Sequence, residues 1–285
     1  MMFVFAGIGV QAQTNTGTKP FVNSTHTYSV TKGMTNSDLA WTVPTGTVGG
    51  SAVTPNEGTH YNVVSGAGTK DIQIKWLLAG TYTLRLSETR NLASGHVGCP
   101  TNREITVTVV DNTFDVIAEE VLDYEGDGTY VYAEEDCATL ANNPVPDLSN
   151  LGDNSDDVFG TTKRKFRVRM TGGDASKSWS FNYTLTDIET TYKLKDVTID
   201  GGTFAGGLVN VPANTSEVII SITYSTNKNT DTSVTNGQDP DVTLELAISD
   251  AKDELGTPDS DLEDTSNKAT YTIYAVPATS GITTN

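Results

Sequence analysis

The sequence predicts an all-β protein built from two tandem β-sandwich domains, of which the second is larger and carries long acidic loops. Apolar residues recur at every second position in many short runs, which is the period of a strand with one face in a core and the other in water. Thr, Ser, Asn, Gly and Val dominate the chain, and good helix formers are scarce. A chain of 285 residues can also hold two domains with a core in each.

The first domain is expected over residues 20–110. Its clearest signal is the run from Ile72 to Leu86, in which apolar residues alternate on both sides of a break at Ala79-Gly80. Similar short runs are separated by turn-rich pieces such as Pro44-Thr45-Gly46. The expected strands are 26–31, 39–43, 60–64, 70–77, 80–88 and 103–110. Short strands at this spacing are typical of a sandwich.

The second domain is expected over residues 111–277. Alternating runs predict half-buried strands at 129–132, 164–170, 179–185, 218–222, 242–246 and 271–274. Long polar segments at 141–160, 226–240 and 249–268 separate them. We expect these segments to be surface loops.

The formal net charge of −18 is distributed unevenly. Residues 1–110 hold 7 Lys or Arg against 5 acids, a balance of +2, whereas residues 111–285 hold 11 against 31, a balance of −20. This step supports a domain boundary near residue 111. An acidic balance of this size repels phosphate backbones, so no nucleic-acid partner is expected. A solvated surface is the simpler explanation of the asymmetry, and attraction between unlike domains of neighbouring copies is the alternative.

Both ends of the chain are expected to lie outside the domains. Residues 1–12 are apolar, are too short to span a bilayer and end in the small-x-small pattern Val10-Gln11-Ala12, which is typical of a secretory signal peptide without its basic n-region. A buried first strand at Phe3-Val4-Phe5 is the alternative. Residues 13–19 are predicted to be a polar tether and residues 278–285 a tail. No transmembrane segment is expected elsewhere, and the protein is predicted to be secreted, extracellular or at the cell surface.

One strand pattern in the first domain is more specific than the others. It is a set of apolar strands with a Gly-x-Tyr corner, carried by Trp41-Thr42-Val43, Ile72–Trp76, Gly80–Leu84, Gly98-Cys99 and Ile105–Val109. Over residues 20–110 this pattern resembles the PKD-like, immunoglobulin-like modules of Bacteroidetes secreted surface proteins. The resemblance implies an immunoglobulin-like sandwich that serves as a spacer or binding module.

Within such a sandwich three aromatic residues have expected places. Tyr82 fits a tyrosine corner, with its ring in the core and its hydroxyl bonded to nearby backbone. Trp41 and Trp76 would fill the space between the sheets. The second domain is also expected to be immunoglobulin-like, although it resembles no named family.

The best local motif is the segment 123–134, which follows the calcium-loop pattern D-x-[D/N]-x-[D/N]-G-x5-E except for a Glu at its third position. Oxygen ligands would come from five residues: Asp123, Glu125, Asp127, Thr129 and Glu134. The alternative is a plain hairpin that turns at 125–128, because the residues that follow have strand character. Calcium is the one cofactor that the sequence suggests.

Cys99 and Cys137 are the two cysteines of the chain. In an exported protein they can form a disulfide, which would join the first segment of the second domain to the end of the first domain. Two separate buried thiols are the alternative.

Two other charged features are candidate binding sites. Acidic clusters at 153–157 and 250–264 could be ordered by a hard cation, although such runs are more often solvated. The basic strand Lys163–Arg169 places Lys163, Lys165, Arg167 and Arg169 on one face. We expect that face to meet acidic neighbours across the sheet, with binding of anionic sugars as the alternative.

Catalysis finds little support in the sequence, so an enzyme is not expected. His26, His60 and His96 are isolated and lack the spacing of zinc ligands. No nucleophile elbow or phosphate-binding loop is present, and no acid pair is singled out for glycoside hydrolysis.

The sequence therefore predicts a non-enzymatic surface protein. It would be a structural or adhesive subunit that contacts copies of itself or other surface proteins and assembles into an extracellular filament or layer. The alternative is a carbohydrate-binding or accessory module of a polysaccharide-degrading system, with glycans stacked on Tyr130, Tyr132 or Trp179. Core packing accounts for those aromatic residues equally well.

Overall fold

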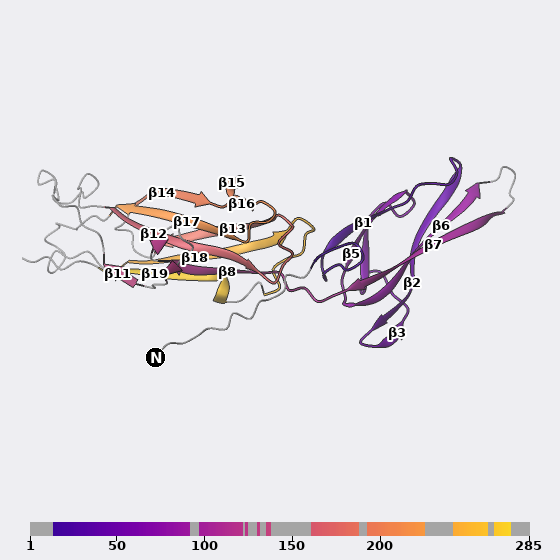
Figure 1. Cartoon of the computed structure of the whole chain (residues 1–285), viewed down its shortest axis with the longest axis horizontal. Coiled ribbons are helices and arrows are strands. Elements are labelled where there is room, and N and C mark those ends of the chain that lie inside the picture. Colours follow the sequence, from indigo (N-terminus) through magenta and orange to yellow (C-terminus); the bar gives the residue numbers. More distant parts are fainter. Residues whose placement is uncertain are drawn as a thin grey trace, which may run out of the picture. The chain divides into compact units, whose positions relative to one another are not determined.

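The computed structural model of the chain is almost entirely β-structure (Figure 1). It describes residues 14–91, 97–121, 123–124, 130–131, 135–137, 161–187, 193–225, 242–261 and 265–274. Within these ranges one short 3-10 turn, Thr265–Asn267, stands beside the strands. The predicted all-β class is confirmed.

The contacts divide the chain into two compact units. Unit 1 consists of Met1–Asp115, Thr171–Trp179 and Ala251–Asp261. Unit 2 consists of Val116–Met170, Ser180–Asp250 and Leu262–Asn285. Two short segments from late in the chain therefore belong with the N-terminal sandwich.

Unit 1 contains two antiparallel sheets. One has the order β1-β5-β4, with β1 at Thr25–Ser29, β5 at Asp71–Trp76 and β4 at Tyr61–Ser65. The other has the order β3-β2-β6-β7, with β3 at Ser51–Val53, β2 at Ser37–Val48, β6 at Gly80–Asn91 and β7 at Val97–Val109. In these orders β1 and β7 are edge strands, one in each sheet.

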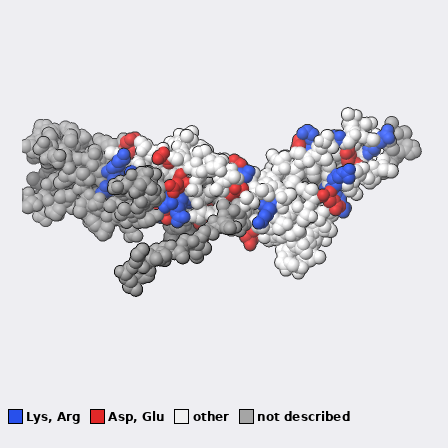
Figure 2. Space-filling view, in the orientation of Figure 1, with Lys and Arg blue, Asp and Glu red and all other residues white. Residues whose placement is uncertain are grey.

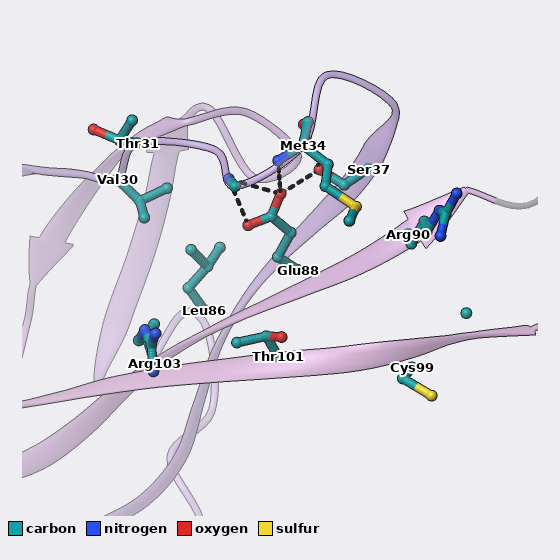
Figure 3. A pocket seen from close by; sticks show the side chains of 12 residues that line it. Val30, Thr31, Met34, Ser37, Leu86, Glu88, Arg90, Cys99, Thr101 and Arg103 are labelled. Carbon is teal, nitrogen blue, oxygen red and sulfur yellow. Dashed lines mark hydrogen bonds between the residues drawn. The ribbon is translucent and has the colours of Figure 1, made fainter.

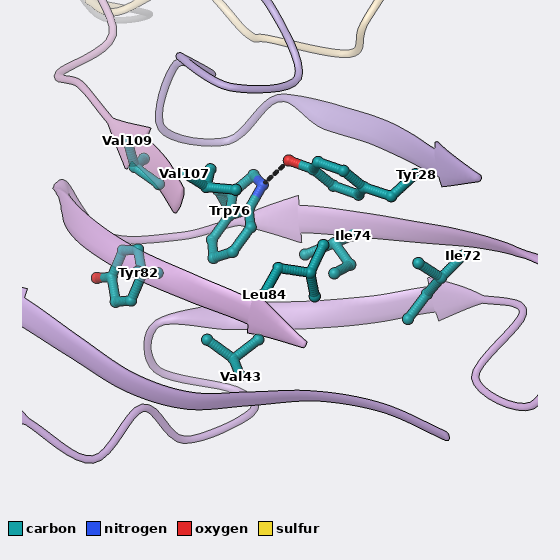
Figure 4. Close-up of a cluster of buried hydrophobic side chains, with 9 residues drawn as sticks. All are labelled: Tyr28, Val43, Ile72, Ile74, Trp76, Tyr82, Leu84, Val107 and Val109. Carbon is teal, nitrogen blue, oxygen red and sulfur yellow. Dashed lines mark hydrogen bonds between the residues drawn. The ribbon is translucent and has the colours of Figure 1, made fainter. Parts of the chain in front are cut away.

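The core of this sandwich is built around stacked aromatic rings (Figure 4). The rings of Trp76 and Tyr82 are stacked with centroids 5.3 Å apart, and both side chains are almost fully buried. Trp76 Nε1 donates a hydrogen bond of 2.9 Å to the hydroxyl of Tyr28. The Tyr82 hydroxyl in turn donates to the carbonyl of Leu78 at 3.0 Å, which confirms the predicted tyrosine corner.

Trp41 takes a different place from the one expected. Its side chain is half-buried and packs against the core from the side, while Nε1 donates to the carbonyl of Thr69 at 2.9 Å. The indole nitrogen thus reaches a polar partner at the surface, whereas the ring covers apolar neighbours.

The turn between β4 and β5 depends on a glycine. Gly66 has φ +82°, and a Cβ at this position would lie 2.0 Å from the carbonyl oxygen of Asp71. Only glycine fits both the left-handed backbone and this close approach.

Unit 2 contributes most of two larger sheets. The four-stranded sheet has the order β14-β17-β12-β8, with bounds Lys193–Asp200, Glu217–Ser225, Thr161–Thr171 and Asp115–Val121. The six-stranded sheet has the order β11-β19-β18-β13-β16-β15, with bounds Glu135–Cys137, Lys268–Tyr274, Val242–Asp253, Trp179–Asp187, Leu208–Val211 and Thr203–Ala205. A two-stranded piece pairs β9, Asp123–Tyr124, with β10, Tyr130–Val131. The β18 strand extends to Asp253, so the expected loop at 249–268 begins instead as a strand.

The basic strand β12 behaves as the alternation predicts. Arg169 donates to both carboxylate oxygens of Glu119, and Arg167 pairs with Glu217 at 2.9 Å and with Glu119 at 3.5 Å. Glu119 lies on β8 and Glu217 on β17, the two neighbours of β12 in the sheet. The prediction that this face meets acidic partners across the sheet is confirmed. On the opposite face Arg164 is buried, with its guanidinium 4.9 Å from the centroid of the Tyr271 ring.

Candidate binding groove of unit 1

A hollow of about 560 Å³ lies between β6, β7 and the connection from β1 to β2 (Figure 3). A second hollow of about 270 Å³ lies between β1 and β7. The two share Val30, Leu86 and Arg103, so together they form one depression, which we call the β1–β7 groove.

The floor of the groove is apolar. Leu84 and Leu86 of β6 alternate inward and are almost fully buried, and Tyr28 of β1 lies beside them. The rim exposes two large apolar side chains, Met34 at 48% and Ile105 at 43%. A rim of this kind loses unfavourable water contacts when a ligand covers it.

Ile105 explains why the groove exists. Strand alternation places it on the same face of β7 as Val107 and Val109, both of which are buried. The end of β7 is covered by residues 18–22, because Thr108 N donates to Thr18 O at 2.9 Å and Val110 N to Pro20 O at 3.0 Å. That cover does not extend over Ile105, so its core-facing side chain borders an open groove.

The backbone along the β1 wall has the geometry of an unpaired sheet edge. In β1, Val30 N donates to Lys70 O, so the even-numbered residues bond to β5. The odd-numbered residues therefore point the other way, and Thr25 N confirms this by donating to Leu255 O at 2.8 Å. By the same parity Thr27 and Ser29 direct their N–H and C=O groups away from β5. An extended segment can pair with such an edge.

Glu88 lies inside the hollow but is already bonded (Figure 3). Its carboxylate accepts hydrogen bonds from the hydroxyl of Ser37 and from the backbone N–H groups of Gly33, at 3.0 Å, and Met34, at 3.2 Å. The bond from Ser37 is the largest cause that holds the pKa of Glu88 below its ordinary value, followed by the bond from Gly33. We assign Glu88 the role of anchoring the loop between β1 and β2.

Two arginines of the groove have no ion-pair partner among the described residues. Arg90 and Arg103 both line it and are exposed, and in the part of the chain that the structure describes neither has a carboxylate partner. The neighbouring Arg85 contrasts with them, because its Nε lies 2.6 Å from a carboxylate oxygen of Glu104. The groove therefore combines a buried apolar floor, the free backbone edge of β1 and, within the described residues, two unpaired arginines against the one carboxylate of Glu88.

A second feature of unit 1 is a buried polar cluster centred on Asn15, a residue of the predicted tether. Its side-chain amide donates to Asp253 Oδ2 at 3.1 Å and to Thr257 Oγ1 at 3.0 Å. Its side-chain oxygen accepts from Phe21 N at 3.0 Å and lies 3.0 Å from Nε2 of His26. Because Asn15 is 1% exposed, this segment is fixed to the sandwich at that point.

Burial in this cluster shifts the pKa values of His26 and Asp253. Burial, with the nearby charge of Lys177 as the smaller cause, lowers the pKa of His26 to about 4. His26 is therefore neutral at pH 7. Burial raises the pKa of Asp253, although backbone bonds from Thr257 and Leu255 oppose this.

These contacts account for part of the acidic segment at 250–264. Asp253 accepts bonds from its own loop, and Asp259 accepts from the backbone N–H of Asp261 at 3.1 Å. Among the described residues no group of three or more His, Cys, Asp or Glu could hold a metal ion. The acidic cluster at 153–157 lies outside the described residues.

The predicted calcium loop falls mostly outside the described residues. Asp123 begins β9, which pairs antiparallel with β10 in the register Tyr130↔Tyr124. Glu125, Asp127, Thr129, Glu134 and the side chain of Asp123 are not described. The antiparallel pairing agrees with the hairpin alternative, and the calcium site stays a prediction.

The cysteines and the predicted sugar-binding aromatics have separate outcomes. Cys99 is exposed on β7, so the alternative of two buried thiols is wrong for this residue. Cys137 lies in β11 with a side chain outside the described part, and the disulfide stays a prediction. Trp179 is 2% exposed and belongs to the core, so it is no sugar platform. The side chain of Tyr130, like all of Tyr132, lies outside the described part.

Comparison with known proteins adds only distant likenesses. No protein-family model matches the chain, and no curated protein matches it either. The collagen adhesin of S. aureus has a TM-score of 0.24 at 11% identity and covers 91% of each chain. The C-terminal domain of the antigen I/II-family protein AspA of Streptococcus pyogenes has a TM-score of 0.29 at 12% identity, with 90% of this chain and 94% of that chain covered. The C-terminal domain of the Streptococcus agalactiae AgI/II polypeptide BspA has a TM-score of 0.29 at 9% identity, with 92% of this chain and 95% of that chain covered.

We take no functional conclusion from similarities this remote. Among the described residues, no helix has the length and apolar character needed to cross a bilayer.

Proposed function

We propose that the chain is a secreted, non-enzymatic subunit of an extracellular surface structure, with unit 1 as a PKD-like module of the kind found in Bacteroidetes surface proteins. Its role would be structural or adhesive, and its copies would assemble into a filament or layer. The observation that supports this most directly is the β1–β7 groove, where two edge strands flank a hollow whose rim exposes Met34 and Ile105. Such an arrangement favours contact with another polypeptide.

The sandwich itself suits a load-bearing role. Its core is closed by the stacked rings of Trp76 and Tyr82 and by the hydrogen bonds that anchor their neighbours. In unit 2 a paired charge network on the outer face of β12 joins three adjacent strands. These features stabilise the sheets.

The test is direct imaging of purified full-length protein over a range of concentrations. We expect negative-stain micrographs and light scattering to show ordered assemblies that grow with concentration. Monodisperse monomers throughout, at low salt and high protein concentration, would count against the assembly.

Glycan binding is the second candidate, because unit 2 exposes an aromatic pair. Phe204 of β15 is 55% exposed, and its ring centroid lies 5.7 Å from that of Tyr183 on β13. Exposed rings of this kind can stack on sugars. A glycan array should then give binding that Phe204→Ala removes, and an array without any binding would eliminate this candidate.

A further inference from the structure

We infer that the β1–β7 groove binds an extended, acidic segment from the residue 111–285 half of a second copy of this chain. This inference rests on the proposed assembly and specifies its contact. It follows from three properties of the groove: its shape, its free backbone and its charge.

The shape and backbone call for an extended segment. The apolar side chains that the groove leaves exposed are Met34 and Ile105 on its rim, above the buried floor residues Leu84 and Leu86. Along the wall, Thr27 and Ser29 direct backbone groups away from β5 at every second residue, the repeat of a strand. An extended segment that covers the apolar rim can therefore form main-chain bonds with β1 at the same time.

The charge specifies an acidic occupant. Lys70 and Arg85 are neutralised by Asp71 and Glu104, but Arg90 and Arg103 have no such partner among the described residues. Most of the surface of unit 1 that is visible in Figure 2 is uncharged. With Glu104 paired to Arg85, the groove has two arginines against the single carboxylate of Glu88, which leaves a small positive balance. A carboxylate that approaches them gains attraction without displacing an existing ion pair.

The chain itself supplies the complement. Residues 111–285 carry 31 acids against 11 bases, whereas residues 1–110 carry 5 against 7. A contact from the acidic half of one copy to the groove of the next uses two different surfaces, so it is heterologous. Heterologous contacts that do not close into a ring continue into a filament.

The experiment measures self-association of the full-length protein by sedimentation velocity as a function of concentration and NaCl. The test variant is Arg90→Glu/Arg103→Glu. The matched control is Lys19→Glu/Lys75→Glu, which makes the same charge change at side chains that do not line the groove. Tryptophan fluorescence and thermal unfolding verify that each variant is folded.

We expect association of the wild type to weaken as salt rises, because exposed charges are screened. The arginine double variant should weaken association at least about tenfold, the equivalent of about 1.4 kcal/mol, while the lysine control changes it much less. Thr27→Pro provides an independent variant, because it removes an N–H that points away from β5 and so leaves the β1–β5 bonds in place. It should also weaken association.

Each alternative outcome has a distinct meaning. If the arginine and proline variants associate as the wild type does, the groove is not the contact, although the proposed assembly stands. If the lysine control is weakened as much as the arginine variant, general charge rather than the groove drives association, and the inference is wrong. If the wild type stays monomeric, both the inference and the proposed assembly fail.

Discussion

Replacing Asn15 with alanine tests whether the N-terminal segment is part of the fold or a tether. The side chain is 1% exposed and binds Asp253, Thr257 and the backbone N–H of Phe21. Removing the side chain leaves two buried groups without their present partner. One is the backbone N–H of Phe21, which has no other hydrogen-bond acceptor within the cluster, and the other is one carboxylate oxygen of Asp253. A buried polar group left unpaired costs about 1–3 kcal/mol.

Two such groups give an expected loss of about 3 kcal/mol in the free energy of unfolding. For a chain of this size that corresponds to a fall of about 6–12 °C in the melting temperature. Thr18→Ala is the matched control, because Thr18 is exposed and only its backbone carbonyl is bonded. Surface substitutions of this kind usually change stability by less than about 0.5 kcal/mol.

The chain offers a convenient probe for this measurement. All three tryptophans, Trp41, Trp76 and Trp179, belong to unit 1, so intrinsic fluorescence reports the unfolding of that unit. Denaturant titrations of both variants should therefore show a lower midpoint for Asn15→Ala alone. If Asn15→Ala unfolds within about 0.5 kcal/mol of the Thr18 control, the cluster adds no stability and the segment behaves as a tether.

Three other substitutions test separate parts of the molecule. Tyr82→Phe deletes the bond to Leu78 and should cost about 1 kcal/mol by denaturant titration, so an unchanged midpoint would contradict the role of the tyrosine corner. Glu119→Gln removes the charge that two arginines of β12 share. The free energy of unfolding should fall by about 1 kcal/mol, and by less at high salt. A loss that is insensitive to salt would argue against an electrostatic origin. The pKa of His26 falls from 6.5 to about 4 on folding. Between these two pH values the unfolded chain binds more protons than the folded chain, so the free energy of unfolding should decrease as the pH falls from 6.5 to 4. The full shift is worth about 3 kcal/mol and screening reduces it to about 2; His26→Gln should flatten this part of the pH profile relative to the wild type.

The sandwich of unit 1 could be predicted because its signal is local. Alternation over Ile72–Leu86 fixes which side chains face inward, and the structure buries Ile72, Ile74, Trp76, Tyr82 and Leu84 accordingly. The same reasoning predicted the ion pairs of β12. In both cases the period of a single strand decides which side chains share a face. The partners of the β12 arginines, Glu119 and Glu217, lie about 50 positions away, and the sequence indicated them only through the acidic balance of residues 111–285.

The strands that were missed carry weaker patterns. β14, at Lys193–Asp200, mixes charged and apolar residues, and β15 consists of three exposed residues at a sheet edge. Their pairing with β17 and β16 depends on tertiary contacts. Strand preference is set by such neighbours as much as by the residues themselves.

The Asn15 cluster could not be predicted, because it joins residues separated by more than 150 positions. In the sequence Asn15 sits among Thr, Gly and Gln, which is the composition of a flexible linker. The acidic segment near Asp253 likewise resembles a solvated run. Each becomes interpretable only when the fold brings a buried donor to a buried acceptor.

The groove could not be predicted from the sequence either. Ile105 continues the apolar alternation of Val107 and Val109, so the sequence assigns all three to the core. Whether a core-facing residue is covered depends on how far neighbouring segments such as residues 18–22 extend, and this is not encoded in the strand that carries it. At Ile105 the cover ends, which leaves an apolar side chain in reach of Arg103 at the shared wall of the groove. An apolar residue that obeys the strand period and is nevertheless exposed is therefore an indication that a further strand has room to bind.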